Sequence, residues 1–312
     1  MGPFSRGVSI LIYHRVIPEK DPLFPEQVSA ADFDLQMRLL ARWFEVLPLA
    51  EAINRIRDGS LPRRAACVTF DDGYADNAEI ALPILMRHGV PATFFLASGF
   101  IDGGTMWNDS VIEIVRAARP GSLDARCVGL HILPVTSIES RRRAIEELLS
   151  FLKYLPGDER QRRVDILQHE ALSERIAPMM MSTDQVRMLH QAGMEIGAHT
   201  VTHPILATLD LERATSEIAE SKRQLESITR APVGSFAYPN GKPGIDYGAE
   251  HVSVVKKLGF HAAVTTAWGV ANSESDLYQL PRFTPWDRTP GRFLLRLMQN
   301  TFSTRPQRVA AF

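Results

Sequence analysis

Two adjacent carboxylates, Asp71 and Asp72, follow a short apolar run in the string Thr-Phe-Asp-Asp-Gly-Tyr of residues 69–74. A helical pattern begins soon after, so we expect the pair at the carboxyl end of a strand, where α/β barrels collect catalytic groups. Neighbouring carboxylates repel each other unless positive charge lies near, and a divalent cation would supply it. One carboxylate could then bind the cation while the other acts as a base. Because the helix macrodipole alone also favours acidic residues at a helix start, the pair by itself leaves both interpretations open.

Two histidines four residues apart, His199 and His203, follow the strand-like segment 194–198. Imidazole nitrogens bind zinc at ~2.0–2.1 Å, and this spacing lets both reach one ion. The spacing also arises by chance at an appreciable rate, so it is weak evidence alone. Both histidines, however, lie in a loop that leaves a predicted strand, as the acid pair does. Two histidines and one carboxylate, with open positions for water and substrate, are typical of a hydrolytic metal site.

Two further candidates follow predicted strands. The Pro-Asn-Gly turn after residues 234–238 could direct the backbone N–H of Asn240 toward an oxyanion, although a plain loop is the alternative. His14 follows residues 8–13 and could protonate a leaving amine, since the unperturbed pKa of histidine lies near neutrality. A lone histidine is more often a core or surface residue, so its role stays open at this point.

Short apolar runs alternate with longer amphipathic segments, which is typical of a βα-repeating domain. We expect strands at residues 8–13, 66–70, 92–97, 195–198, 234–238 and 262–265, and helices at residues 31–44, 76–88, 183–192, 211–229 and 249–258. The stretch from about 108 to 181 breaks this alternation and shows no convincing strand. We therefore expect one domain, residues 1–312, with a helical insertion at about 108–181.

The composition excludes several classes of protein. Lysine and arginine number 35 against 36 acidic residues, whereas a nucleic-acid-binding protein normally carries a basic excess. The 2 cysteines cannot form a thiolate zinc site, so any metal ligands must be nitrogen and oxygen. No apolar run approaches ~18 residues, and no secretory leader is evident. We expect no membrane span and a cytoplasmic protein, while the oligomeric state cannot be predicted.

Together these segments resemble the NodB-homology polysaccharide deacetylases, also called carbohydrate esterase family four. Residues 69–73 are similar to the first motif of that family, and residues 199–203 to its His-(Ser/Thr)-x-x-His motif. The resemblance covers roughly residues 7–285 outside the insertion and implies an irregular (β/α)7 barrel. It implies Asp71 as the catalytic base, Asn240 as the backbone oxyanion donor, and one divalent ion held by Asp72, His199 and His203.

Two positions depart from the family pattern. The third motif usually begins with an arginine that braces the catalytic aspartate, and Ala237 stands there instead, so Arg282 or Arg15 could take this role. The usual carboxy-terminal histidine motif is not recognisable after residue 283. The opening Tyr-His-x-Val of residues 13–16 is similar to the poly-β-1,6-N-acetylglucosamine deacetylases, in which the acid histidine comes from the amino-terminal strand. This resemblance implies His14 as the acid and an exopolysaccharide as the substrate.

The resemblance thus implies a metal-dependent hydrolase that removes N-acetyl groups from an N-acetylhexosamine-containing polysaccharide or its precursor, releasing acetate. Zinc is the expected ion, with cobalt, nickel or iron as alternatives. Trp107, Tyr238 and Trp286 could offer rings for sugar stacking, although such rings are more often packed amphipathically. A hydrolase of small non-peptide amides and a glycan-binding module without turnover are the alternative functions.

Overall fold

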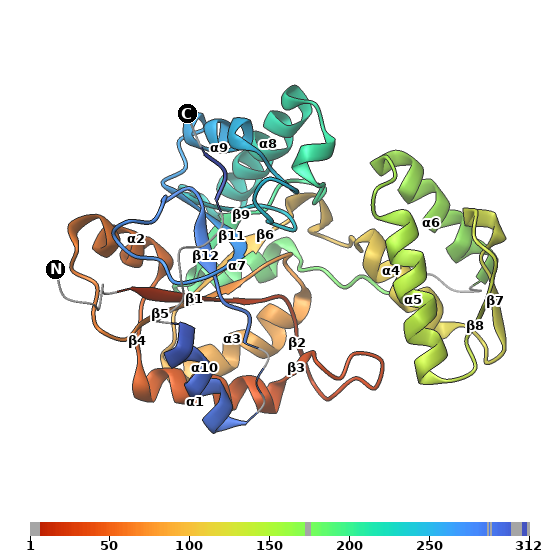
Figure 1. Ribbon diagram of the computed structural model, residues 1–312, viewed down its shortest axis with the longest axis horizontal. Helices are drawn as coiled ribbons and strands as arrows, with labels where there is room; N and C mark the ends of the chain where they lie inside the picture. The colour runs from red at the N-terminus through yellow and green to blue at the C-terminus, as the bar shows by residue number, and fades with distance from the viewer. Residues whose placement is uncertain (1–6, 172–175, 286, 288, 301–307, 311–312) are drawn as a thin grey trace. The chain divides into compact units, whose positions relative to one another are not determined.

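A parallel sheet that curls almost into a closed ring forms the centre of the fold (Figure 1). The computed structural model describes residues 7–171, 176–285, 287, 289–300 and 308–310. Within this described part, seven strands succeed one another around the ring: β1 (Val8–Tyr13), β5 (Ala65–Phe70), β6 (Ala92–Leu96), β9 (Glu195–Ala198), β10 (Ser235–Ala237), β11 (Ala262–Trp268) and β12 (Leu280–Arg282). Backbone hydrogen bonds between Phe283 and both Ile10 and Ile12 link the last strand to the first. The expected (β/α)7 barrel is confirmed.

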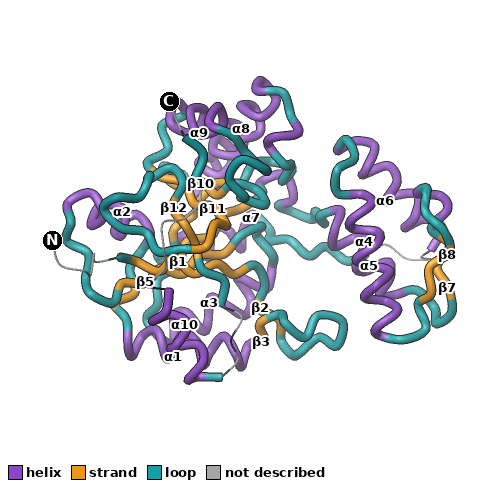
Figure 2. Tube along the Cα trace, in the orientation of Figure 1, coloured by secondary structure: helices purple, strands orange, loops and turns teal. Residues whose placement is uncertain are grey.

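The strands are buried because both of their faces are covered. All six residues of β1 and all six of β5 are buried, as expected of parallel strands with a packed interior and helices outside. Figure 2 shows the strands in orange with helices in purple around them. The helices of the barrel are α1 (Ala30–Trp43), α2 (Leu49–Asp58), α3 (Leu82–His88), α7 (Thr183–Gln191), α8 (Leu211–Thr229), α9 (Ala249–Lys257) and α10 (Pro290–Asn300). Shorter elements are β2 (Val16–Ile17), β3 (Val28–Ser29), β4 (Glu45–Val46) and the 3-10 turns Ser98–Phe100 and Leu206–Thr208.

Aromatic rings pack together between helix α1 and strands β5 and β6. Phe70 of β5 stacks on Phe94 of β6 with ring centroids 4.8 Å apart, and Phe33 of α1 meets Phe70 edge-on. Alternate strand positions, such as Ile10 and Phe95, belong to a second apolar cluster. Residues of β5 also alternate between the two clusters, which holds the strand in one register. Because β5 ends at Phe70, the residues that follow lie at the carboxyl edge of the barrel.

The helix expected at residues 76–88 is interrupted. A π-helical turn, Asn77–Ala81, precedes α3. Pro83 has no N–H to donate to the carbonyl of residue 79, and its ring crowds the preceding turn. A wider turn relieves this crowding, and π turns of this kind occur frequently at functional sites.

The chain divides into two compact units, which we call the barrel unit and the inserted unit. The barrel unit comprises Met1–Glu19, Glu26–Asp102 and Met181–Phe312, and the inserted unit comprises Lys20–Pro25 and Gly103–Met180. The inserted unit has an apolar core of its own and contains α4 (Trp107–Ala117), α5 (Ile138–Leu152), α6 (Gly157–Ala171) and a 3-10 turn, Arg126–Val128. Among the described residues, no helix has the length and apolarity needed to span a bilayer.

The expectation that the insertion lacks strands is wrong. Strands β7 (Ser122–Asp124) and β8 (Ile132–Pro134) pair antiparallel within the inserted unit. Each has three residues, of which only the central Leu123 or Leu133 is buried. Such short strands give no run of alternating residues long enough to be read from the sequence.

Candidate active site

Three side chains from two strand ends converge at the carboxyl edge of the barrel. Asp72 follows β5, whereas His199 and His203 lie in the loop after β9. Asp72 Oδ1 lies 3.5 Å from His199 Nε2 and 3.4 Å from His203 Nε2. One ligand atom from each of the three residues can be chosen so that all lie within 4.8 Å of one another. The two separations from Asp72 match those between ligands that share one cation with bonds of ~2 Å, so the three residues form a candidate metal site.

The buried oxygen of Asp72 fits a metal ion. Among the described residues, Asp72 Oδ1 accepts no hydrogen bond, although it is shielded from water. A buried carboxylate oxygen without a donor is costly, and a cation would remove that cost. The donor set of one carboxylate and two imidazoles suits zinc and similar divalent ions.

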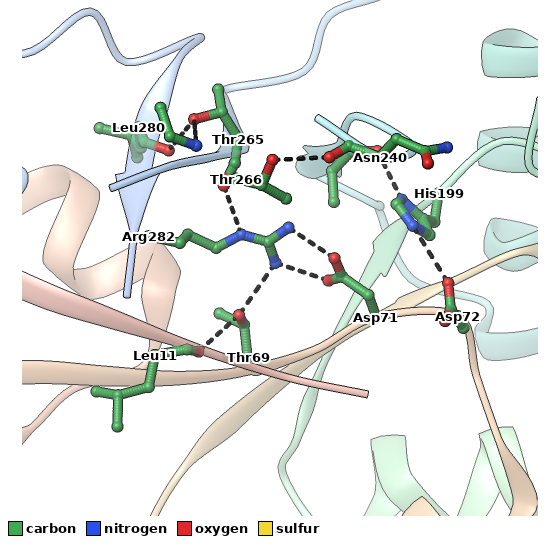
Figure 3. Close-up of polar contacts among 12 residues, drawn as sticks. Leu11, Thr69, Asp71, Asp72, His199, Asn240, Thr265, Thr266, Leu280 and Arg282 are labelled. Atoms are coloured by element: carbon green, nitrogen blue, oxygen red, sulfur yellow. Dashed lines mark hydrogen bonds and ion pairs between the residues drawn. The ribbon is translucent and has the colours of Figure 1, made fainter. Parts of the chain in front are cut away.

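The protonation states of Asp72 and His203 favour metal binding. His199 Nδ1 donates to the carbonyl of Ala237 at 2.7 Å, which turns Nε2 toward Asp72 (Figure 3). Desolvation lowers the pKa of His203 to about 4, so its imidazole is neutral near pH 7. Burial alone would raise the pKa of Asp72, but its contacts with His199 and His203 outweigh burial and hold that pKa far below the usual range. An ionised carboxylate thus faces imidazole nitrogens that can bind a cation.

The loop that carries the two histidines is strained and held on two sides. Thr200 and His203 have φ values of 65° and 54°, in the left-handed region that costs free energy for residues other than glycine. The N–H groups of Ser98 and Gly99 donate to the carbonyls of Thr200 and Val201 at 3.1 and 2.9 Å. A side chain on Gly99 would lie 2.8 Å from Val201, so this close approach requires glycine.

Glu217 of α8 holds the other side of the same loop. Its Oε2 accepts the N–H groups of Val201 and Thr202, each at 2.8 Å, and its Oε1 accepts the hydroxyl of Thr202 at 2.8 Å. Carboxylates that accept two backbone N–H groups make strong, charge-assisted hydrogen bonds. Glu217 therefore fixes the turn between the two histidines without contacting either ring.

Replacing Glu217 with alanine is expected to weaken metal binding roughly 10–100-fold, the range found when outer-shell partners of metal ligands are removed. The physical reason is that the strained loop loses three hydrogen bonds and no longer presents both imidazoles together. Glutamine retains an oxygen for the two N–H groups, so Glu217→Gln should stay close to wild type. Metal dissociation constants from a competing chelator would measure both variants. Equal affinities for Glu217→Ala and wild type would show that the loop holds its shape without this carboxylate.

The neighbouring carboxylate, Asp71, has a different partner. Both carboxylate oxygens of Asp71 accept from the guanidinium of Arg282, at 2.7 and 2.6 Å, and both residues are buried (Figure 3). Arg282 is itself held by the carbonyl of Thr265 at 2.8 Å and by the hydroxyl of Thr69 at 3.2 Å. Burial would raise the pKa of Asp71, but the charges of Arg282 and His199 outweigh it and lower that pKa. Asp71 is thus ionised and fixed in orientation beside the metal-binding triad.

Replacing Arg282 with lysine should lower the turnover number of the enzyme by roughly 10–100-fold while the metal content stays near wild type. A single ammonium group cannot make two parallel bonds to Asp71 and also reach Thr265 and Thr69, so the carboxylate loses its fixed orientation. Steady-state kinetics and metal analysis on the same preparation would check this. A variant that keeps wild-type turnover would show that orientation of Asp71 is not limiting.

The second arginine considered for bracing, Arg15, has another partner. Arg15 Nε donates to Asp76 at 2.7 Å, and its guanidinium lies 4.9 Å from the centroid of the Tyr74 ring. His14, its neighbour, is exposed, and its charge contributes to the low pKa of both Asp71 and Asp72. The ring of His14 therefore lies within electrostatic range of the acid pair.

Asn240 stands in a turn that is tied to β11. Its φ is 58°, its carbonyl accepts the hydroxyl of Thr266 at 2.7 Å, and the N–H of Thr266 donates to Gly241 at 3.0 Å. Within the described part of the chain, the backbone N–H of Asn240 donates to no protein acceptor. The turn thus holds a backbone donor that remains available to a bound molecule.

Tyr238 cannot serve as the stacking surface expected from the sequence. It is fully buried, its ring stacks on Tyr247 with centroids 3.9 Å apart, and its hydroxyl donates to the carbonyl of Tyr278. Trp107 begins α4 in the inserted unit, where the guanidinium of Arg160 lies 4.7 Å from the centroid of its ring. Trp286 lies outside the described residues. A sugar-stacking role for Trp107 stays a prediction.

An ionised, braced acid beside a candidate metal site of one carboxylate and two imidazoles, at the carboxyl edge of a barrel, is the arrangement expected of a hydrolase. The sequence profile of the family described as polysaccharide deacetylase matches residues 58–124 and 158–263, more than half of the chain. These segments include Asp71, Asp72, His199 and His203. The chain therefore belongs to the polysaccharide deacetylase family of hydrolases, carbohydrate esterase family four.

Individual relatives are similar over most of the chain. One relative is YxkH of Bacillus subtilis (strain 168), which carries the name polysaccharide deacetylase. It is 22% identical to this chain over 275 residues, which cover 88% of this chain and 69% of YxkH. The Streptococcus pyogenes deacetylase PplD, solved in complex with acetate, gives a TM-score of 0.63 at 20% identity and covers 94% of this chain and 99% of its own. IcaB from Ammonifex degensii gives a TM-score of 0.60 at 16% identity, covering 96% and 98%. At these identities, the two solved structures establish the fold.

Proposed function

We propose that this deacetylase removes N-acetyl groups from N-acetylhexosamine units of a polysaccharide or of its precursor, releasing acetate and a free amine. The observation that carries the proposal is the division of labour between two adjacent acids. Asp72 faces His199 and His203, whereas Asp71 is turned away into the fork of Arg282. One acid is therefore placed to hold a cation while the other remains available to a water molecule.

The residues divide the chemistry of amide hydrolysis among them. A divalent cation held by Asp72, His199 and His203 would polarise the acetyl carbonyl and make a water molecule more acidic. Asp71 is ionised and accepts the proton of the attacking water. The free N–H of Asn240 donates to the oxyanion, a contact worth several kcal/mol in comparable sites, about 2.7–4 kcal/mol. His14 then protonates the departing nitrogen, which is too basic to leave as an anion.

The segment that carries His14 supports a particular class of polymer. The Tyr-His-x-Val opening supplies a histidine at the end of the first strand, as in deacetylases of poly-β-1,6-N-acetylglucosamine. We therefore propose a β-1,6-linked exopolysaccharide of N-acetylglucosamine as the substrate and zinc as the native ion.

Acetate release from three kinds of compound tests the proposal. Purified enzyme should release acetate from β-1,6-linked N-acetylglucosamine oligomers in the presence of zinc, and more slowly from β-1,4-linked oligomers. Turnover of small formamides or ureides without turnover of either oligomer would favour the small-amide hydrolase instead. Binding of the oligomers without metal-dependent acetate release would indicate a glycan-binding module.

A further inference from the structure

Two residues that follow the acid pair, Asp76 and Asn77, form hydrogen bonds with consecutive residues just after strand β1. Asn77 Nδ2 donates to the carbonyl of His14 at 2.9 Å. Asp76 accepts the Nε of Arg15 at 2.7 Å and the N–H of Val16 at 3.2 Å. Asp76 and Asn77 therefore bind three successive residues after β1, namely the two that join it to β2 and the first residue of β2.

The acid pair itself is joined to the same segment. The N–H of Asp71 donates to the carbonyl of Tyr13 at 2.9 Å. Since His14 is the next residue along the chain, its backbone is held between Asp71 on one side and Asn77 on the other. The segment that carries His14 is thus fixed relative to the proposed base by contacts from residues 71–77.

The hydrogen bonds of Asn77 fix the orientation of its side-chain amide. It is fully buried, and its Nδ2 also donates to Asp76 Oδ1 at 3.0 Å, so both acceptors require the nitrogen on this side. Among the described residues, Asn77 Oδ1 accepts no hydrogen bond, which costs free energy in a buried site. Asn77 is also the first residue of the π-helical turn. Its Nδ2 is therefore shared between Asp76 and the backbone carbonyl of His14.

The exposed side chain of His14 contrasts with its hydrogen-bonded backbone. Its side chain is open to solvent, whereas its backbone carbonyl is bound by a fully buried amide. Side chains that must deliver a proton need a fixed backbone and a free ring, because a displacement of about 1 Å can cost about 100-fold in rate. The contacts of Asn77 meet the first requirement and leave the ring unhindered.

We propose that Asn77, supported by Asp76, is a positioning residue for His14 and sets the geometry of leaving-group protonation. This inference rests on the proposed function, in which His14 is the acid. It assigns to Asn77 an effect that depends on the leaving group of the substrate. An amide needs its nitrogen protonated, whereas a 4-nitrophenolate departs unaided.

The experiment compares two substrates for each variant, an N-acetylglucosamine oligomer and 4-nitrophenyl acetate. The ratio of the two rates is independent of the fraction of enzyme that is folded and metal-loaded. Asn77→Ala should lower the ratio of oligomer rate to ester rate by about tenfold or more, as displacement of a catalytic group does. His14→Ala should lower it further, by about 100-fold, the lower end of general acid catalysis. Asp76→Asn, which keeps an oxygen for Val16 but loses the ion pair with Arg15, should lower it less than Asn77→Ala.

A matched control lies at the opposite end of β1. Asn300 of α10 is also buried, its Nδ2 donates to the hydroxyl of Ser9 at 3.0 Å and to the carbonyl of Gly269 at 3.2 Å, and its Oδ1 is likewise unpaired among the described residues. Asn300→Ala removes an equivalent amide that contacts the same strand, away from His14. Its rate ratio should equal that of wild type even where its stability falls.

The outcomes distinguish a failure of the proposed function from a failure of the role given to Asn77. Failure of the wild type to release acetate from any oligomer, with ester turnover intact, contradicts the proposed function. Acetate release by the wild type together with an unchanged ratio in Asn77→Ala, or an equal fall in Asn300→Ala, overturns only the role given to Asn77. An unchanged ratio in His14→Ala overturns it as well, since there is then no acid to position.

Discussion

Replacing Asp71 with asparagine is expected to abolish acetate release while leaving the metal site loaded. The asparagine side chain cannot accept a proton from water, and loss of a general base typically costs about 10²–10⁴ in rate. Asp72, His199 and His203 keep their positions, because none of them depends on Arg282. Acetate assays and metal analysis by mass spectrometry on one preparation would measure both quantities. Wild-type turnover of Asp71→Asn would show that another group is the base.

The same substitution should also destabilise the protein. Arg282 is almost completely buried, and asparagine leaves its charge uncompensated; removing one partner of a buried pair costs about 3–5 kcal/mol. The double variant Asp71→Asn, Arg282→Met removes both charges and should recover most of the lost melting temperature without recovering turnover. This control separates chemistry from folding. Restored turnover in the double variant would mean that the single variant failed because it was unfolded.

Removing His199 is expected to have a comparably large effect by a different route. His199→Ala deletes a metal ligand and the hydrogen bond to Ala237, so the loss of metal affinity should exceed the 10–100-fold typical of outer-shell partners. Acetate release should fall in parallel and should return when excess zinc is added. Isothermal titration with zinc, together with the acetate assay, would measure both.

His261→Ala provides the control for that experiment, because this histidine is exposed at the start of β11, away from the carboxyl edge. It should bind zinc as wild type does. Treatment of the wild type with a chelator should reproduce the loss seen in His199→Ala. Acetate release that persists in a metal-free preparation would contradict the proposed role of the triad.

Protons should compete with the cation. Burial lowers the pKa of His199, but its contacts with Asp72 and Asp71 outweigh burial and raise that pKa above the usual value. The metal-free site therefore binds a proton at His199 more readily than an ordinary histidine does. Metal affinity, measured by titration at several pH values, should decrease as the pH is lowered, since the cation must displace that proton.

The long apolar runs made most of the barrel predictable. β1, β5 and β6 are almost continuously apolar, as parallel strands covered on both faces must be. β12 was missed because it has three residues, one of which is Pro281, and its pairing with β11 is irregular. Helices α2 and α10 were also not predicted. Closure of the ring depends on such short elements, whose identity is decided by tertiary contacts rather than by local pattern.

The site was predictable where local sequence sets geometry. Asp72 and His199 each follow a predicted parallel strand, so their meeting at one edge follows from the fold class. The choice between Arg282 and Arg15 could not be made, because Arg282 lies 211 residues from Asp71 and reaches it only through closure of the barrel. Glu217 and Asn77 were missed because each lies in a helical pattern that gives no sign of a loop held by the side chain.

The pairing of Asp71 with Arg282 has a consequence for how activity is gained during synthesis. The arginine belongs to the last strand of the ring, whereas the acid follows the second. A nascent chain that has emerged only through β11 already contains both histidines and both acids, yet its prospective base lacks the guanidinium that fixes its orientation. Contacts so distant along the chain form late, since the intervening polypeptide must first be ordered. Enzymatic competence is therefore acquired in a final step, when the closing strand docks, and partly synthesised chains should be hydrolytically silent.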